Sequence, residues 1–244
     1  MKSLLLRIYE KFINLPHRRK IIDITDNYVK RLYWAIGSPG CNPGNLYCFN
    51  YAIGHLPSEA PIIEIGSFCG LSTNMLTYYK ERNKVHNPLI TCDKWEYNVT
   101  KDKKMIGKSS ISFLKYGKFI KETYIRSIRL FSRYDLPYTI ELLSNDFFKA
   151  WRNSEEVQDV LNRPIKLGGP ISFCYIDGSH LYDYVKRDFK NCHEFLERGG
   201  FILFDDSWDG SPYGIGISRV IKEIKESGKY KIIIKNPNYF FKKL

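Results

Sequence analysis

The stretch PIIEIGSFCGLST, residues 61–73, decides the fold of this chain of 244 residues. Its apolar run IIEI is followed at once by Gly66 and, four positions later, by Gly70. A short apolar run closed by glycine is typical of a buried strand that turns directly into the next element. Glycine also lets the backbone turn tightly and lets a ligand approach it closely. The stretch therefore predicts a strand, a ligand-binding turn and a helix.

The same alternation of strand and helix continues along the chain. Further apolar runs predict strands at 89–92, 139–143, 171–176 and 201–204. Helical spacing predicts helices at 71–82, 109–134, 146–161 and 181–197. This order needs crossover connections, so it predicts an α/β fold with a Rossmann-like, mostly parallel sheet. The runs 230–235 and 239–242 flank an Asn-Pro-Asn turn and predict an antiparallel C-terminal hairpin, giving about seven strands in all.

Two segments lie outside this alternation. Residues 1–57 precede the first strand and have helical periodicity, so we expect an N-terminal helical extension before a main domain at 58–244. The connection 94–135 is long for a crossover, and its apolar residues keep helical spacing. It predicts an inserted basic helical cap.

The formal net charge is +12, and the whole excess lies in two segments. Residues 1–35 hold eight Lys and Arg against three acids, and residues 101–135 hold ten against three. Such clustering favours an anionic partner or surface, although solvated helix faces explain it equally well. The apolar stripe of a predicted helix at 3–14 leaves two options open. It packs on the sheet or on a second copy in a homo-oligomer, or residues 1–20 bind a membrane surface.

Other features narrow the class of protein. No run approaches about 18 apolar residues, so we expect no transmembrane helix, and no secretory leader is evident. The six cysteines form no Cys-x-x-Cys pair, which gives zinc or a redox dithiol no support. We expect reduced, mostly buried thiols in a cytoplasmic protein, with peripheral membrane contact as the open option.

Acidic residues stand at or next to the ends of four predicted parallel strands. In open parallel sheets, ligands bind beyond the carboxyl ends of the strands. One such carboxylate is often only a helix cap, but a row along one edge marks a candidate site. The row comprises Glu64, Asp93, Asp177, Asp205 and Asp206, and Asp146 follows the remaining strand.

Three of these carboxylates predict a metal site. Asp177 should meet Asp205 and Asp206, because neighbouring strands lie about 4.8 Å apart. Close carboxylates repel unless a cation lies between them, and oxygen ligands favour Mg²⁺, Mn²⁺ or Ca²⁺ over zinc. The alternative is that one aspartate points inward and its neighbour caps the next turn. His180 follows Asp177 closely and is a candidate general base, because imidazoles exchange protons near neutral pH.

The turn motif indicates the cofactor. EIGSFCG lacks the middle glycine of the dinucleotide fingerprint and the Lys-Ser/Thr of a P-loop, which argues against NAD and FAD. Acidic-x-Gly-x-x-x-Gly resembles motif I of class I S-adenosylmethionine-dependent methyltransferases. Together with YIDGSHLY at 175–182 and GGFILFDD at 199–206, it makes residues 60–242 similar to the small-molecule group that includes macrolide-sugar O-methyltransferases. Phe147 departs from the family, in which a small hydroxyl residue is usual at that position.

The resemblance implies metal-assisted transfer of a methyl group from S-adenosylmethionine to a hydroxyl of a small molecule. The acceptor would be a sugar or polyol, with anionic and lipid-linked forms included. Mg²⁺ or Mn²⁺ on Asp177, Asp205 and Asp206 would lower the pKa of the acceptor oxygen, and His180 and Asp177 would be catalytic. Gly66→Val should then abolish cofactor binding and leave the sheet folded. The implied cofactor-binding residues are Glu64, Gly66, Ser67, Gly70, Ser72, Asp93, Asn145 and Asp146.

Two alternatives belong to other classes. The charge suggests a nucleic-acid methyltransferase, but the Asn/Asp-Pro-Pro-Tyr/Phe signature of such enzymes is replaced here by DGSH at 177–180, so nucleic acid is the less favoured partner. The basic N-terminus suggests a non-catalytic membrane-associated module of the same fold. Retention of the acidic row and of His180 argues against a loss of chemistry.

Overall fold

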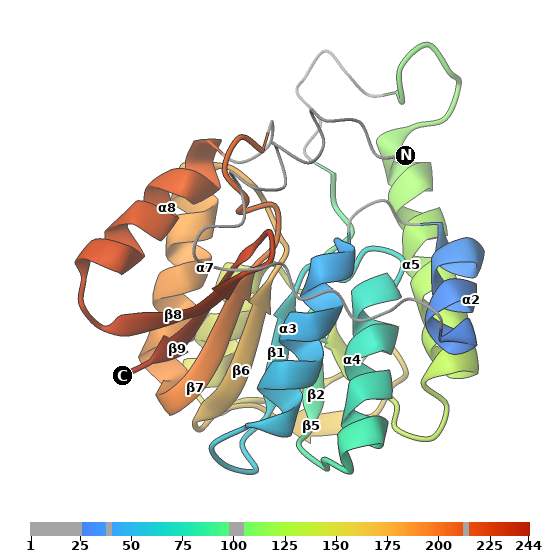
Figure 1. Ribbon diagram of the computed structural model, residues 1–244. Helices are drawn as coiled ribbons and strands as arrows, with labels where there is room; N and C mark the ends of the chain where they lie inside the picture. The colour runs from blue at the N-terminus through green and yellow to red at the C-terminus, as the bar shows by residue number, and fades with distance from the viewer. Residues whose placement is uncertain (1–25, 38–40, 98–104, 212–214) are drawn as a thin grey trace, which may run out of the picture.

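The computed structural model describes residues 26–37, 41–97, 105–211 and 215–244 (Figure 1). The helix predicted at 3–14 and the membrane contact predicted for 1–20 lie outside these residues. None of the helices in the described ranges is both long enough and apolar enough to cross a membrane.

A seven-stranded sheet lies at the centre, with the strand order β3-β2-β1-β6-β7-β9-β8. The first five strands in this order are parallel to their neighbours. The last two form the predicted antiparallel hairpin, with β9 paired to β7 and β8 at the edge. The fold class predicted from the sequence is confirmed. The strand bounds are β1 Ile62–Ile65, β2 Leu89–Cys92, β3 Tyr138–Ile140, β6 Ile171–Ile176, β7 Leu196–Phe204, β8 Tyr230–Lys235 and β9 Tyr239–Lys243.

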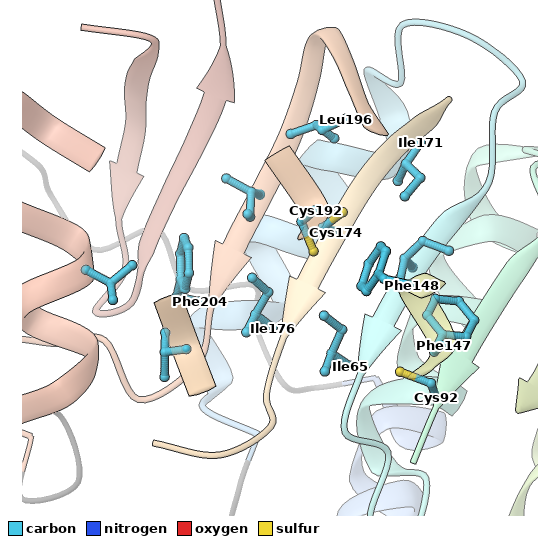
Figure 2. Close-up of a cluster of buried hydrophobic side chains, with 14 of the residues drawn as sticks. Ile65, Cys92, Phe147, Phe148, Ile171, Cys174, Ile176, Cys192, Leu196 and Phe204 are labelled. Carbon is cyan, nitrogen blue, oxygen red and sulfur yellow. The ribbon is translucent and has the colours of Figure 1, made fainter. Parts of the chain in front are cut away.

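Helices cover both faces of the sheet (Figure 1). One face packs against α3 (Pro43–Gly54) and α4 (Leu71–Asn83), with α2 (Asn27–Ile36) and α5 (Phe113–Phe131) alongside α4. The other face packs against α6 (Ser144–Arg152), α7 (Tyr182–Phe195) and α8 (Ile215–Glu226). Figure 2 shows the second core, where Ile65 and Ile176 meet aromatic side chains such as Phe148.

The short central strands are buried on both sides, as expected for parallel strands beneath two helical layers. In β1, Ile63 and Ile65 belong to the core beneath α6, α7 and α8, whereas Ile62 belongs to the core beneath α3 and α4. A local capping hydrogen bond marks the start of α3. The side chain of Asn42 accepts a hydrogen bond from the Gly44 amide at the start of α3.

The connection 94–135 contains the predicted helix, here α5. Its inner face packs Ile120, Tyr124 and Ile128 with Trp95 in a small separate core. Within the described part of this connection, α5 lies next to α4 as a crossover helix flanking the sheet (Figure 1). All six cysteines are buried and unpaired, as the sequence predicted.

The helix predicted at 146–161 is wrong in its second half. The helix α6 ends at Arg152, and Glu156–Gln158 (β4) and Pro164–Lys166 (β5) form a small antiparallel hairpin. Asp159 holds the tip of this hairpin, because its carboxylate accepts hydrogen bonds from the amides of Leu161 and Arg163, each at 2.8 Å. A local carboxylate-to-amide bond of this kind competes with helix formation.

Two strands have ends that differ from the prediction by several residues. The strand β7 begins at Leu196, five residues before the predicted start at 201, and it takes over the end of the predicted helix at 181–197. The strand β3 ends at Ile140 and not at 143. Pairing to a neighbouring strand sets both ends, and a sequence pattern does not encode that pairing.

Gly44 allows the start of α3 to pack against the turn between β8 and β9. A Cβ at this position would lie 1.7 Å from the backbone oxygen of Asn236 and 3.0 Å from Cδ of Pro237. We predict that Gly44→Ala lowers the free energy of unfolding by about 2 kcal/mol or more, because the backbone must move. Urea denaturation measures this change.

Gly54→Ala, in the same helix, is the matched control for this prediction. Its Cβ would meet only the Asn83 side chain, at 3.1 Å from Oδ1. The change in unfolding free energy should be below about 1 kcal/mol. Equal losses in the two variants would show that the contact with the β8–β9 turn is unimportant.

Candidate active site

The central strands end in register, and this places the acidic row. Ile65 pairs with Cys92 on one side and with Ile176 on the other, and Ile176 pairs with Phe204. Figure 2 shows these four residues along one edge of the core. The residue after each strand end donates its amide to the last carbonyl of the next strand. These bonds are Asp93 to Ile140 (3.2 Å), Gly66 to Cys92 (3.0 Å), Asp177 to Ile65 (2.8 Å) and Asp205 to Ile176 (2.9 Å).

The glycine turn after β1 lies against this edge. Gly66 and Gly70 have φ of +85° and +88°, which side chains rarely tolerate. A Cβ on Gly66 would lie 2.2 Å from the backbone oxygen of Asp177. The expectation that Gly66→Val spares the sheet is therefore corrected, because the added side chain would push β1 and β6 apart. A Cβ on Gly70 would lie 2.7 Å from Oγ of Ser127 in α5.

Asp93 holds the glycine turn in place. Its Oδ2 accepts from the amides of Ser67 at 2.8 Å and Phe68 at 3.0 Å, and its Oδ1 accepts from the Trp95 amide at 2.7 Å. The Trp95 indole donates to the Phe68 carbonyl at 2.9 Å and closes the arrangement. Burial raises the pKa of Asp93, and the backbone amides oppose the rise. This clamping role adds to the predicted contact with the cofactor.

Glu64 lies in β1 beneath the turn and is fully buried. Its Oε2 accepts from the Thr73 hydroxyl of α4 at 2.5 Å, whereas Oε1 has no hydrogen-bond partner among the described residues. Burial raises its pKa to about 7, although the hydrogen bond from Thr73 acts in the opposite direction. The raised pKa favours the protonated form of Glu64 beneath the turn.

Two asparagines orient Asp205. Asn45 of α3 and Asn238 of the β8–β9 turn each donate to Asp205 Oδ1 at 2.6 Å. Asn238 also donates to Oδ1 of Asn45 at 2.9 Å, so the three side chains form one buried network. Asp205 Oδ2 is buried without a hydrogen-bond partner in the described part of the chain. Burial raises the pKa of Asp205 to about 6, against the lowering effect of Asn45.

Asp177 lies next to this network. The hydroxyl of Tyr175 accepts from Asn45 at 3.4 Å and donates to Asp177 Oδ2 at 3.3 Å. Burial and the charges of Asp205, Glu64 and Asp206 raise the pKa of Asp177 well above its usual range. Asp177 and Asp205 line a small pocket together with His180. His180 Nδ1 lies 3.6 Å from Asp206 Oδ2, so these two side chains are also neighbours.

The structure brings most of the predicted site residues together. Glu64, Gly66, Ser67, Gly70, Ser72 and Asp93 surround the glycine turn, and the metal and catalytic candidates follow the next two strands. Asn145 and Asp146 are instead exposed in the first turn of α6. Within the described chain, no hydrogen bond links either side chain to the turn, so their predicted contact with adenine stays a prediction.

The structure does not show the predicted metal site among the described residues. Among the residues that the structure describes, no group of three or more His, Cys, Asp and Glu side chains is arranged to hold a metal ion. The predicted set of Asp177, Asp205 and Asp206 is therefore not found as a formed site, since Asp205 Oδ1 is held by amides and Asp206 lies beside His180. The unpartnered Oδ2 of Asp205 next to Asp177 fits a smaller site, because Mg²⁺ can be held by two carboxylates and water.

Sequence reasoning missed the residues that position the acids. Asn45 and Asn238 lie in segments interpreted only as a helix and a turn, and their shared contact depends on tertiary packing. Tyr175 could have been found, because strand alternation places it on the same face as Glu64. Trp95 follows Asp93 by two residues, but nothing in its position signals the bond to Phe68.

Comparison with known proteins identifies the family to which the chain belongs. The model of a methyltransferase domain family matches residues 63–207, from the first strand to just beyond the Asp205-Asp206 pair. The match covers more than half of the chain. The chain therefore belongs to this methyltransferase family, as its resemblance to class I methyltransferases predicted.

Solved structures share the fold over nearly the whole chain. An O-methyltransferase from Bacillus cereus in complex with S-adenosylhomocysteine is 14% identical, with a TM-score of 0.56, and the match covers 96% of this chain and 95% of that one. The Podospora anserina methyltransferase PaMTH1 is 12% identical, with a TM-score of 0.58 and coverage of 100% and 97%. The calicheamicin methyltransferase CalS11 is 12% identical, with a TM-score of 0.54 and coverage of 91% and 94%.

One curated relative matches a shorter region. An uncharacterised protein of Acanthamoeba polyphaga mimivirus is 35% identical over 63 residues, which is 25% of this chain and 28% of that protein. So short a match carries no information about the activity of either whole protein.

The raised pKa of Glu64 makes a prediction about stability. The folded protein holds a proton on Glu64 up to a pKa of about 7, whereas the ordinary value is 4.5. The folded state thus binds more protons between these values, so the free energy of unfolding falls as the pH rises through them. Glu64→Gln removes this term. Between about pH 4.5 and pH 7, the free energy of unfolding of the variant should rise by about 3 kcal/mol relative to that of the wild type.

Urea denaturation of the cofactor-free protein across this pH range measures the gain. Glu59→Gln, at an exposed position just before β1, is the control and should follow the wild type at every pH. If the Glu64→Gln curve runs parallel to the wild-type curve, Glu64 does not carry the buried proton.

Proposed function

We propose that the protein transfers a methyl group from S-adenosylmethionine to a hydroxyl oxygen of a small molecule. One observation carries the proposal. A glycine turn clamped by Asp93 stands beside two buried carboxylates and His180, at the carboxyl edge of a methyltransferase-family sheet. Two solved methyltransferases with this fold support it, because both are bound to S-adenosylhomocysteine and the one from Bacillus cereus is an O-methyltransferase.

The cofactor fits the glycine turn by its chemistry. When bound, S-adenosylmethionine supplies an electrophilic methyl group on its sulfonium. Gly66 and Gly70 let the turn adopt its positive φ angles, and Asp93 fixes its course by accepting from the amides of Ser67 and Phe68. The ribose hydroxyls that the resemblance assigns to Asp93 would share its roughly four acceptor positions with these amides. The buried Ser67 hydroxyl, which lacks a partner within the described ranges, is a further donor at this place.

The acceptor would be activated at Asp177, Asp205 and His180. A divalent cation held by Asp177 and Asp205 Oδ2 would lower the pKa of an acceptor hydroxyl. Asn45 and Asn238 hold Asp205 so that Oδ2 is the oxygen left for such an ion. His180 would accept the hydroxyl proton, and the neighbouring Asp206 would stabilise the imidazolium that forms. The acceptor oxygen would then form a bond to the methyl carbon as the bond from sulfur to that carbon breaks, with S-adenosylhomocysteine as the leaving group and positioning supplying much of the rate.

We propose a sugar as the acceptor, and one of the solved structures supports this choice. A second structure of the calicheamicin methyltransferase is described as a TDP-rhamnose 3'-O-methyltransferase, and its fold matches this chain with a TM-score of 0.50 and 12% identity. We extend this to a sugar or polyol acceptor for the present protein. Carboxylates beside a base suit such substrates, because they can order neighbouring hydroxyls and remove one proton.

Calorimetry with S-adenosylhomocysteine tests the cofactor. The protein should bind S-adenosylhomocysteine and S-adenosylmethionine and give no heat with NAD. Asp93→Ala should weaken binding by at least about tenfold, because the turn loses the two bonds that its amides donate to this carboxylate. Glu59→Gln should bind as the wild type does. Folded protein that gives no heat with either compound would sink the proposal.

A transfer assay tests the acceptor side. Methyl-labelled S-adenosylmethionine is offered with sugar nucleotides, free polyols and phenols, with and without EDTA. Turnover should vanish with EDTA and return with Mg²⁺ or Mn²⁺. Asp205→Asn and His180→Ala should each lose about 100-fold or more in turnover while cofactor binding persists. Turnover unaffected by EDTA would contradict the metal part and leave His180 as the sole activating group.

A further inference from the structure

The outer face of α5 has no role in the site. Its inner face packs on Trp95 and the glycine turn, while its outer face lies at the side of the molecule (Figure 1). At about 100° per residue, the exposed positions form one continuous arc of roughly 160°. They are Leu114, Lys115, Lys118, Phe119, Glu122, Arg126, Arg129 and Leu130.

This outer face is strongly basic. It holds Lys115, Lys118, Arg126 and Arg129 against the single acid Glu122. No ion pair forms at any of these four cations among the described residues, although the same helix pairs Lys121 with Glu141 at its border. Four cations against one acid give this face a net positive charge, which attracts an anionic partner.

Apolar side chains border this charged arc, with Leu114 at one edge and Phe119 and Leu130 at the other. Leu114 is 70% exposed, Phe119 62% and Leu130 67%. On the neighbouring helix α2, Trp34 is 71% exposed and has the Arg31 guanidinium over its ring at 5.2 Å. Large side chains this exposed are costly in water, and their presence among cations marks a contact surface.

We propose that the outer face of α5 binds an anionic lipid surface. Charge complementarity selects this occupant, since phosphate and carboxylate headgroups match the four cations while the acyl boundary accepts Leu114, Phe119 and Leu130. A second copy of this chain would present the same cations and repel. A nucleic acid would use the cations but would leave Leu114 and Leu130 in water, because aliphatic side chains neither pair nor stack with bases.

Vesicle flotation of the full chain tests the proposal. The protein is mixed with phosphatidylcholine vesicles with or without phosphatidylserine, at low and high salt. Binding should require phosphatidylserine and weaken with salt. Lys118→Glu with Arg129→Glu should reduce it at least about tenfold, because each cation near the surface contributes roughly fivefold. Phe119→Ser with Leu130→Ser should also weaken binding, mainly in the part that survives high salt.

The matched control changes the same charge elsewhere. Lys190→Glu with Lys231→Glu alters exposed positions on α7 and β8 that lie in no ion pair within the described chain, and should bind as the wild type does. Equal losses in the two charge variants would overturn the proposal, because net charge alone would explain them. Normal vesicle binding by the Lys118→Glu, Arg129→Glu variant would also overturn the proposal, since residues 1–20 would then account for the binding. The same holds if single-stranded RNA binds in an α5-dependent way while vesicles do not.

Discussion

The site depends on one constraint, the register in which the central strands pair. Ile65 lies level with Cys92 and Ile176, and the residue after each strand continues the backbone ladder by one bond. This last backbone bond, and not a side-chain contact, aligns the four residues that follow the strands, namely Gly66, Asp93, Asp177 and Asp205. A slip of one residue would turn each carboxylate to the opposite face of the sheet. The apolar cores on both faces prevent the slip, so the packing of the sheet also determines the geometry of the chemistry.

Burying this row of acidic side chains lowers the stability of the fold, and hydrogen bonds from the surrounding structure reduce that loss. Isolated carboxylates lose hydration when buried, and like charges raise one another's pKa. Backbone amides satisfy Asp93, and side-chain amides satisfy one oxygen of Asp205. Glu64 and Asp177 are satisfied only in part, and burial raises the pKa of both. Burial therefore favours the protonated forms of Glu64 and Asp177, and a bound cation or a donated hydrogen bond would favour the charged forms.

The sequence was sufficient for the periodic part of this architecture. The five parallel strands, the terminal hairpin and the glycine turn follow from local patterns that packing does not override. The hairpin at 156–166 was missed because Asp159 stabilises a turn where the apolar spacing indicates a helix. The clamp on Asp205 was missed because Asn45 and Asn238 come from opposite ends of the chain. Local patterns thus identified the acids, whereas long-range contacts decide which acid oxygens are left for a ligand.

The helix α5 contributes to the glycine turn with one face and to the protein surface with the other. Ser127 on its inner face donates to the Cys69 carbonyl at 2.9 Å, and the helix lies so close to Gly70 that a side chain there would collide with Ser127 and Tyr124. The inner face is thus one wall of the glycine turn. The outer face presents cations and large apolar side chains to the surroundings. Both faces belong to one rigid element about 28 Å long at 1.5 Å per residue. A partner that binds the outer face would therefore contact the same helix that packs against the glycine turn. The long connection from β2 to β3 thus places one helix both beside the turn and at the surface.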